Sequence, residues 1–259
     1  MDSAERTAGQ GSPLHVLAET AGEAGLRTRW RDETAAAPAP DRVRWDRALA
    51  LAGHLHDADR WGDQPYVNHL LRVAIRLRSE YDVRDPAVLC AALLHDSVED
   101  HAWRLARTME LAAPAGWAVP AAPQPPPDRA GLLTAATVAL NRLAGWFGAP
   151  VADLVEAVTN PPPDPGRDRH LQYRDHLLVS LRANPWARVV KASDFVDNAG
   201  TIQPSAGPRA RRTAEKYRTV APLLCDLVAL PDTPLAGAAR ARVLTELTTV
   251  TRRLDRLLA

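Results

Sequence analysis

The chain has 259 residues, of which 46% are hydrophobic and 24% are charged, and its formal net charge at pH 7 is +1. This is ordinary globular usage, and so balanced a charge argues against the basic field with which whole chains bind nucleic acid or membranes. The two cysteines lie in apolar runs and the N-terminus does not resemble a secretory leader. No apolar run approaches the ~20 residues of a membrane-spanning helix. We therefore expect a reduced, cytoplasmic location.

The first predicted elements lie in the N-terminal third of the chain. Residues 1–41 are rich in Gly, Ala and Pro, and we expect a loosely ordered extension with one short helix that stops near Gly22 or Gly25. Helical periodicity follows over 43–55 and again over 69–81, where apolar residues share one face and arginines lie opposite.

The next predicted helix starts with Asp85 as its N-cap and Pro86 in its first turn. After an apolar run it ends in four ionisable residues, His95, Asp96, Glu99 and Asp100. In one continuous helix, residues four apart share a face. His95 would then share a face with Glu99, and Asp96 would share the neighbouring face with Asp100. Burying so many ionisable groups is costly unless something binds them, and a divalent metal is the usual partner. The alternative is a capped helix end with solvated acids.

Helices also dominate the second half of the chain. An insert over 101–131 interrupts them, with six prolines in the fourteen residues 114–127. Helical patterns then cover 132–147, 150–159, 171–181, 186–201, 209–230 and 235–258. Alternating strand patterns are scarce, so the sequence predicts an all-α fold. We expect one domain over 42–230, with a C-terminal helix within 231–259 packed on it.

A polar stripe runs along the predicted helix over 186–201. Its members, spaced three, four and three residues apart, are Lys191, Asp194, Asn198 and Thr201. This spacing places them on one helix face, as a phosphate-and-metal site requires. A solvated helix face is the alternative interpretation.

Taken together, these blocks resemble the HD phosphohydrolase superfamily. The order His69, His95-Asp96, Asp194 is similar to its H…HD…D metal signature. More narrowly, Pro-Tyr-x-x-His, Ala-Ala-Leu-Leu-His-Asp-x-x-Glu-Asp and Lys-x-x-Asp-x-x-x-Asn-x-x-Thr resemble the hydrolase domain of Rel/Spo-type alarmone enzymes and the stand-alone small alarmone hydrolases. The resemblance covers roughly residues 43–201, with the blocks in the same order, and implies a multi-helix HD-domain bundle.

The resemblance also implies a role for each matched residue. A divalent metal, usually Mn²⁺ in that family although the ligands also suit Fe²⁺ or Zn²⁺, would be held by His69, His95, Asp96 and Asp194. The residues that would orient the attacking water and move its proton are Glu99 and Asp100. Contacts to the phosphates or the nucleotide would come from Arg60, Lys191, Asn198 and Thr201.

Some positions depart from the family pattern. Residues that are often basic or polar in relatives are replaced by Trp61, Phe195 and Gly200, and a lysine by Asn160. Among the remaining histidines, we do not expect His54 or His56 to bind metal. We expect surface or loop positions for His101, His170 and His176.

The implied activity is removal of the 3′-pyrophosphate from guanosine 3′,5′-bis(diphosphate), with a phosphorylated nucleotide as the only expected partner and neither nucleic acid nor a membrane. The departures leave open an HD phosphohydrolase that acts on another phosphorylated nucleotide or metabolite, because pyrophosphate recognition depends on charge-assisted contacts. A third hypothesis is a non-catalytic relative that senses a nucleotide.

Overall fold

The structure, a computed structural model, describes residues 13–111, 116–121, 126, 128–202 and 207–259. In chain order the elements are α1 (Pro13–Thr34), α2 (Ala39–Leu55), β1 (Arg60–Trp61), β2 (Gln64–Pro65), α3 (Val67–Ser79), α4 (Pro86–Leu94), α5 (Ser97–Leu105), β3 (Met109–Glu110), β4 (Trp117–Ala118), α6 (Arg129–Phe147), α7 (Ala149–Val158), α8 (Arg169–Ala183), α9 (Pro185–Gly200), α10 (Gly207–Ala229) and α11 (Gly237–Leu258). The all-α prediction is confirmed, since the described strands form only two short antiparallel pairs. Of the described helices, none combines the length and apolarity needed to cross a membrane.

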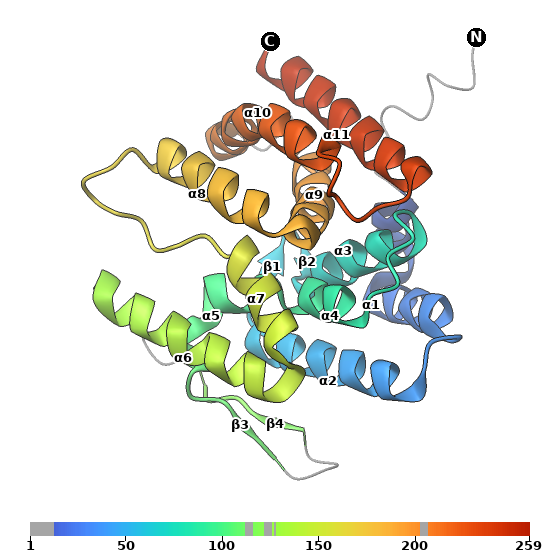
Figure 1. Cartoon of the computed structure of the whole chain (residues 1–259), viewed down its shortest axis with the longest axis vertical. Coiled ribbons are helices and arrows are strands. Elements are labelled where there is room, and N and C mark those ends of the chain that lie inside the picture. Colours follow the sequence, from blue (N-terminus) through green and yellow to red (C-terminus); the bar gives the residue numbers. More distant parts are fainter. Residues whose placement is uncertain (1–12, 112–115, 122–125, 127, 203–206) are drawn as a thin grey trace.

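Helix α9 lies at the centre of the bundle (Figure 1). Asn184 caps its N-terminus by accepting a hydrogen bond from the backbone N–H of Ala187 at 3.2 Å, and Pro185 occupies the first turn. The helix contacts α3, α4, α7, α8, α10 and α11, and nearly all its residues are buried. Of the polar stripe predicted on this helix, Lys191 and Asp194 are therefore buried, whereas Asn198 and Thr201 are partly exposed.

The segment predicted as one helix through residue 100 is two short helices. The cap is as expected, since the Asp85 carboxylate accepts hydrogen bonds from the N–H groups of Ala87 and Val88 at 2.8 and 3.3 Å. However, α4 ends at Leu94 and α5 begins at Ser97, so the prediction of a continuous helix is wrong. His95 and Asp96 form the junction between the two helices, which places both side chains where α3 and α9 also approach.

Helix α1 is longer and more buried than the short helix expected in a loosely ordered extension. The backbone leaves helical geometry at Gly22 (φ 60°, ψ −156°) but resumes it, and Gly25 does not end the helix. Leu26 and Trp30 are buried, and α1 packs along α3. The Trp30 ring meets Trp45 of α2 edge-on, with 5.6 Å between ring centroids. Residues 1–12 lie outside the described part of the chain.

The described part of the Pro-rich insert contains the β3–β4 hairpin, in which Met109 pairs with Ala118. Its Trp117 side chain donates a hydrogen bond to the Arg47 carbonyl of α2 at 3.0 Å. The same ring lies 4.7 Å from Trp146 of α6, centroid to centroid. This portion of the insert thus packs against α2 and α6, at the bottom of Figure 1, although half of 114–127 lies outside the described residues.

We predict that Trp30→Ala lowers the free energy of unfolding by about 3–5 kcal/mol, the usual cost of removing a large buried aromatic side chain. Trp30 is only 2% exposed, whereas Val43 on α2 is 58% exposed and serves as the control, Val43→Ala. Urea unfolding followed by circular dichroism measures both variants. An equally small decrease in the free energy of unfolding for both variants would mean that α1 contributes little to the core.

Candidate metal centre

The four predicted metal ligands meet at one point, from α3, the α4–α5 junction and α9. The Nε2 atom of His95 lies 3.0 Å from Asp96 Oδ2 and 3.6 Å from Asp194 Oδ1. The Nε2 atom of His69 lies 3.5 and 3.4 Å from the same two oxygens. All four side chains are largely buried, and His69, His95 and Asp96 form a group that could hold a metal ion.

The second ring nitrogen of each histidine is fixed by a hydrogen bond. His69 donates from Nδ1 to Asp197 Oδ2 at 2.8 Å, and His95 donates from Nδ1 to the Ala92 carbonyl at 2.8 Å. In its neutral form each ring therefore carries its lone pair on Nε2, and the two Nε2 atoms are 3.3 Å apart. Two lone pairs facing each other at this distance repel unless a proton or a cation lies between them. Histidines that bind metal in proteins are held in this way.

Carboxylates surround the two imidazoles. Burial opposes protonation of His95, yet Asp96 and Asp194 raise its pKa to about 10. Burial likewise opposes protonation of His69, but hydrogen bonds to Asp194 and Asp197 raise its pKa well above the usual range. The pocket therefore favours positive charge. A donor set of two imidazoles and two carboxylates fits a divalent transition-metal ion.

Asp197 was not singled out in the sequence, yet its buried carboxylate supports the centre. Besides the bond from His69, it accepts hydrogen bonds from Arg72 at 2.9 Å and from Arg76 at 3.1 Å. His15 of α1 lies 3.4 Å from the same carboxylate. Two features of the sequence could have pointed to Asp197. It follows Asp194 by three residues, and the two arginines that pair with it lie one turn apart after His69.

Aromatic rings line the other side of the centre. The Trp61 ring stacks on His69 at 5.4 Å between centroids, with an interplanar angle of 24°. The hydroxyl of Tyr66 donates a hydrogen bond to Asp96 Oδ2 at 2.7 Å. Trp61, which replaces a basic residue of the family pattern, thus covers an imidazole and adds no charge.

The two predicted catalytic acids have different surroundings. The exposed Glu99 carboxylate accepts hydrogen bonds from the Asn160 backbone N–H and side-chain amide, both at 3.0 Å. Asp100 is half-buried, and burial together with the charges of Asp96 and Glu99 raises its pKa to about 8. Asp100 therefore takes up or holds a proton near neutral pH more readily than an ordinary carboxyl group.

The predicted substrate residues are only partly brought together. The Lys191 ammonium lies 2.9 Å from Asp194 Oδ2, and the Asn198 amide donates to Asp194 Oδ1 at 2.6 Å. Thr201 instead donates to carbonyl groups of its own helix. Arg60 is exposed on β1 and donates to the Asp59 carbonyl at 3.0 Å. The roles of these four residues stay predictions.

A further cation from α10 adjoins the site. Lys216 lies 4.1 Å from the centroid of the Tyr173 ring of α8. Burial and the charge of Lys191 lower the pKa of Lys216, and these two residues are the only lysines of the chain. Lys216 was not among the predicted site residues. The one feature of the sequence that could have pointed to it is the rarity of lysine, since nearly all of the 32 basic residues are arginines.

One prediction about the remaining histidines is wrong. His101 is 8% exposed and not a surface residue, because it turns inward towards Asp59. His170 is exposed, as expected, and His176 is half-buried on α8.

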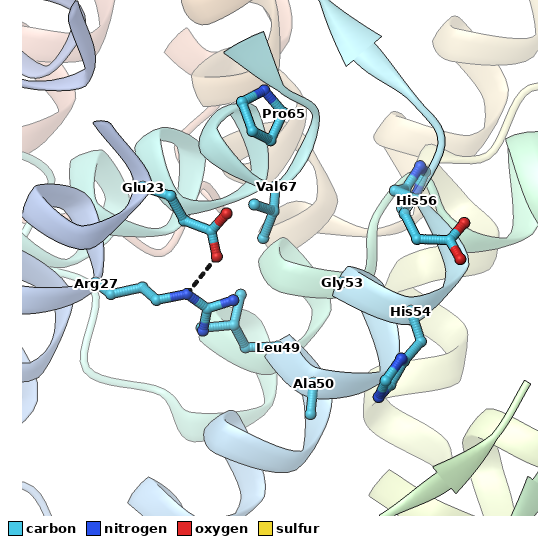
Figure 2. Close-up of a pocket in the computed structure, with 10 residues that line it drawn as sticks. Glu23, Arg27, Leu49, Ala50, Gly53, His54, His56, Pro65 and Val67 are labelled. Carbon is cyan, nitrogen blue, oxygen red and sulfur yellow. Dashed lines mark hydrogen bonds and ion pairs between the residues drawn. The ribbon is translucent and has the colours of Figure 1, made fainter.

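A pocket of about 350 Å³ lies away from this centre, between α1, α2 and the start of α3. Figure 2 shows the ion pair of Glu23 and Arg27 on one side of it and His54 and His56 on the other. None of the four predicted metal ligands lines the pocket, so it is not part of the metal centre.

Two known enzymes are similar to this chain in sequence. A mouse (Mus musculus) guanosine-3′,5′-bis(diphosphate) 3′-pyrophosphohydrolase MESH1 is 29% identical over 154 residues, 58% of this chain and 65% of that protein. The enzyme of the same name from Xenopus tropicalis is 48% identical over 56 residues, 20% of this chain and 31% of that protein. The chain thus spans less than two thirds of the length of these relatives. No protein-family model matches.

A solved structure of a metazoan ortholog of SpoT that hydrolyses ppGpp matches with a TM-score of 0.53 at 21% identity. The match covers 83% of this chain and 97% of that one. The chain therefore has the all-α HD-domain fold and is similar in sequence to (p)ppGpp hydrolases.

We predict that Asp197→Asn weakens metal binding about 10–100-fold, the usual effect of losing the partner that orients a metal-bound histidine. It should also lower the free energy of unfolding by about 3–5 kcal/mol, because Arg72 and Arg76 lose a buried counter-charge. Chelator competition and urea unfolding measure the two effects. The control is Asp153→Asn on the exposed face of α7. Unchanged metal affinity would contradict the positioning role of Asp197.

Proposed function

We propose that this HD-domain chain, similar to (p)ppGpp hydrolases, is a metal-dependent phosphohydrolase that removes the 3′-pyrophosphate of guanosine 3′,5′-bis(diphosphate). The observation that carries the proposal is the convergence of His69, His95, Asp96 and Asp194, with both Nδ1 atoms already engaged. The activity named for the mouse and Xenopus relatives supports the choice of substrate. We propose Mn²⁺ as the ion, with Fe²⁺ or Zn²⁺ as substitutes, and a cytoplasmic location.

A divalent ion at such a centre supplies Lewis-acid polarisation of a phosphoryl oxygen and a lowered pKa for water. We propose that Asp100, whose pKa is raised to about 8, accepts the proton of the attacking water when its carboxyl group is ionised. Glu99, held by Asn160, keeps the adjoining turn of α5 in place and adds negative charge beside Asp100. Tyr66 donates a hydrogen bond to Asp96 and so fixes that carboxylate.

Recognition of the phosphates falls to the basic side of the site. Lys191 is 5% exposed and bonded to Asp194, and Lys216 of α10 lies over the Tyr173 ring. In the substrate-bound enzyme, we propose that Lys216 and Arg60 contact phosphate oxygens while Asn198 and Thr201 border the nucleotide. Neither nucleic acid nor a membrane is a proposed partner.

A second candidate substrate is another phosphorylated nucleotide or metabolite. It is favoured by Trp61 and Phe195, which stand where relatives often carry basic or polar residues. Trp61 stacks on His69, and Phe195 is buried against the Tyr217 ring at 5.3 Å between centroids. Each lost charged hydrogen bond weakens binding by about 1.5–3 kcal/mol.

Purified, Mn²⁺-loaded protein assayed against guanosine 3′,5′-bis(diphosphate), GTP, GDP and p-nitrophenyl phosphate tests the proposal. We expect pyrophosphate release from the first compound with the highest kcat/KM, and none from the variant Asp96→Asn. Turnover of the other compounds alone would favour the second candidate. Tight nucleotide binding without turnover would identify a sensing protein.

We predict that Asp100→Asn lowers kcat by about 10²–10⁴-fold, because an amide cannot accept the proton of the attacking water. Metal content, measured by inductively coupled plasma mass spectrometry, should not change, since Asp100 is not one of the four proposed ligands. Asp63→Asn, an exposed change in the β1–β2 turn, is the control. A wild-type kcat in Asp100→Asn would assign the proton to another group.

We predict that Lys216→Gln raises KM for guanosine 3′,5′-bis(diphosphate) about 10-fold or more, with kcat less affected, because one charged contact to phosphate is lost. Among the described residues, Lys216 makes ring contacts but no ion pair with a carboxylate, so its ammonium is available to substrate. Arg212→Gln, an exposed change on the same helix with the same loss of charge, is the control. Equal KM values for the two variants would contradict a direct contact.

A further inference from the structure

A second group of metal-type ligands lies beside the first centre. His56 follows the end of α2, Asp59 precedes β1, and His101 lies on α5. Asp59 Oδ2 is 2.7 Å from His56 Nδ1 and 2.6 Å from His101 Nε2. The three ligand atoms are all within 4.8 Å of one another. We propose that His56, Asp59 and His101 form a second, weaker site for a divalent transition-metal ion such as Zn²⁺.

The chemistry of the donors supports the proposal. Two imidazoles and one carboxylate, with further positions left to water, form a recurring protein site for Zn²⁺ and Fe²⁺. Burial lowers the pKa of His56 to about 4, so its ring is neutral at pH 7. Burial opposes ionisation of Asp59, but hydrogen bonds from His101 and His56 lower its pKa below the usual value. Two of the three groups thus have the net charge that metal binding requires, and a bound ion would replace the hydrogen bonds from the rings to Asp59.

The position of the group allows an ion to enter. The His56 side chain is fully buried and that of His101 is 11% exposed, whereas that of Asp59 is 34% exposed. The carboxylate therefore opens to solvent on one side while the rings hold the other. The backbone of α5 is non-helical at His101 (φ −132°, ψ 25°), and this turn of the chain carries the ring that reaches Asp59.

The second site does not form a bridged pair with the first. The His56 ring stacks on Tyr66 at 4.6 Å between centroids and an angle of 13°, and the Tyr66 hydroxyl bonds Asp96. One aromatic ring thus separates the two groups, and no carboxylate serves both. The two ions would therefore bind as independent classes of site.

The second site should bind metal less tightly than the first. His69 and His95 both donate their second ring nitrogen to an acceptor. In contrast, His56 Nε2 and His101 Nδ1 are buried with no hydrogen-bond partner among the described residues. Loss of such a partner usually weakens metal binding about 10–100-fold. This difference gives the two sites distinguishable affinities, whatever the substrate of the protein is.

Metal titration of the full chain tests the proposal. Metal-free protein is titrated with Zn²⁺ by isothermal calorimetry, and bound zinc is counted after equilibrium dialysis. We expect two equivalents in two affinity classes for the wild type. His101→Gln and Asp59→Asn should each lose the weaker class only, and Asp96→Asn should lose the tighter class only. His54→Gln, at an exposed histidine on α2, should keep both.

Two outcomes would overturn the proposal: one equivalent in the wild type, or two equivalents retained in both His101→Gln and Asp59→Asn. Circular dichroism melts check that the variants fold, and Asp59→Asn, at the most exposed of the three ligands, guards against misfolding of the histidine variant. Visible absorption of the Co²⁺-substituted protein gives an independent count, because loss of one histidine ligand should remove one set of bands. Since these readouts involve no substrate, they do not depend on whether the proposed hydrolysis is correct.

Discussion

The carboxylate of Asp197 is the constraint on which the rest of the structure depends. It is fully buried and pairs with Arg72 and Arg76 of α3, while His15 of α1 lies at 3.4 Å. A buried charge is tolerated only when its partners stay in place, since removing one leaves another uncompensated. The carboxylate thereby holds α9, α3 and α1 in one arrangement. Because it also accepts the Nδ1 proton of His69, the same network that joins the helices orients a proposed metal ligand.

The two groups of histidines differ in how their rings are held, and this difference has a chemical consequence. In the first group each ring has one nitrogen committed to a protein acceptor, so its second nitrogen is directed at the other ligands. In the second group a single carboxylate oxygen faces both rings, and the remaining nitrogens are unpartnered in the described structure. The first arrangement is organised before an ion arrives, whereas the second would have to give up hydrogen bonds to receive one.

The substrate side of the centre combines aromatic rings with few cations. Trp61 covers His69, and Tyr173 and Tyr217 both lie against Lys216. An ammonium near aromatic faces retains its charge while losing some water, which strengthens its attraction for phosphate. Trp61 and Phe195 contribute no charge to this part of the molecule, whereas Lys216 of α10 contributes an ammonium group beside Tyr173.

The sequence alone determined the all-α class, the helix that begins after Asp85 and the four residues that meet at the candidate metal centre. The first two features depend on periodicity and capping, which are encoded in residues close together in the chain. The four residues were assigned as a set because their short motifs resemble those of a known family. Only the tertiary structure decided that His95 and Asp96 lie at a junction between two helices, that α1 joins the core, and that Asp197 and His101 are buried. Each of these outcomes depends on packing between segments far apart in sequence, such as the 128 residues that separate His69 from Asp197. Local pattern contains no information on such pairs, because the free energy that buries them comes from the assembled helices and not from any one of them.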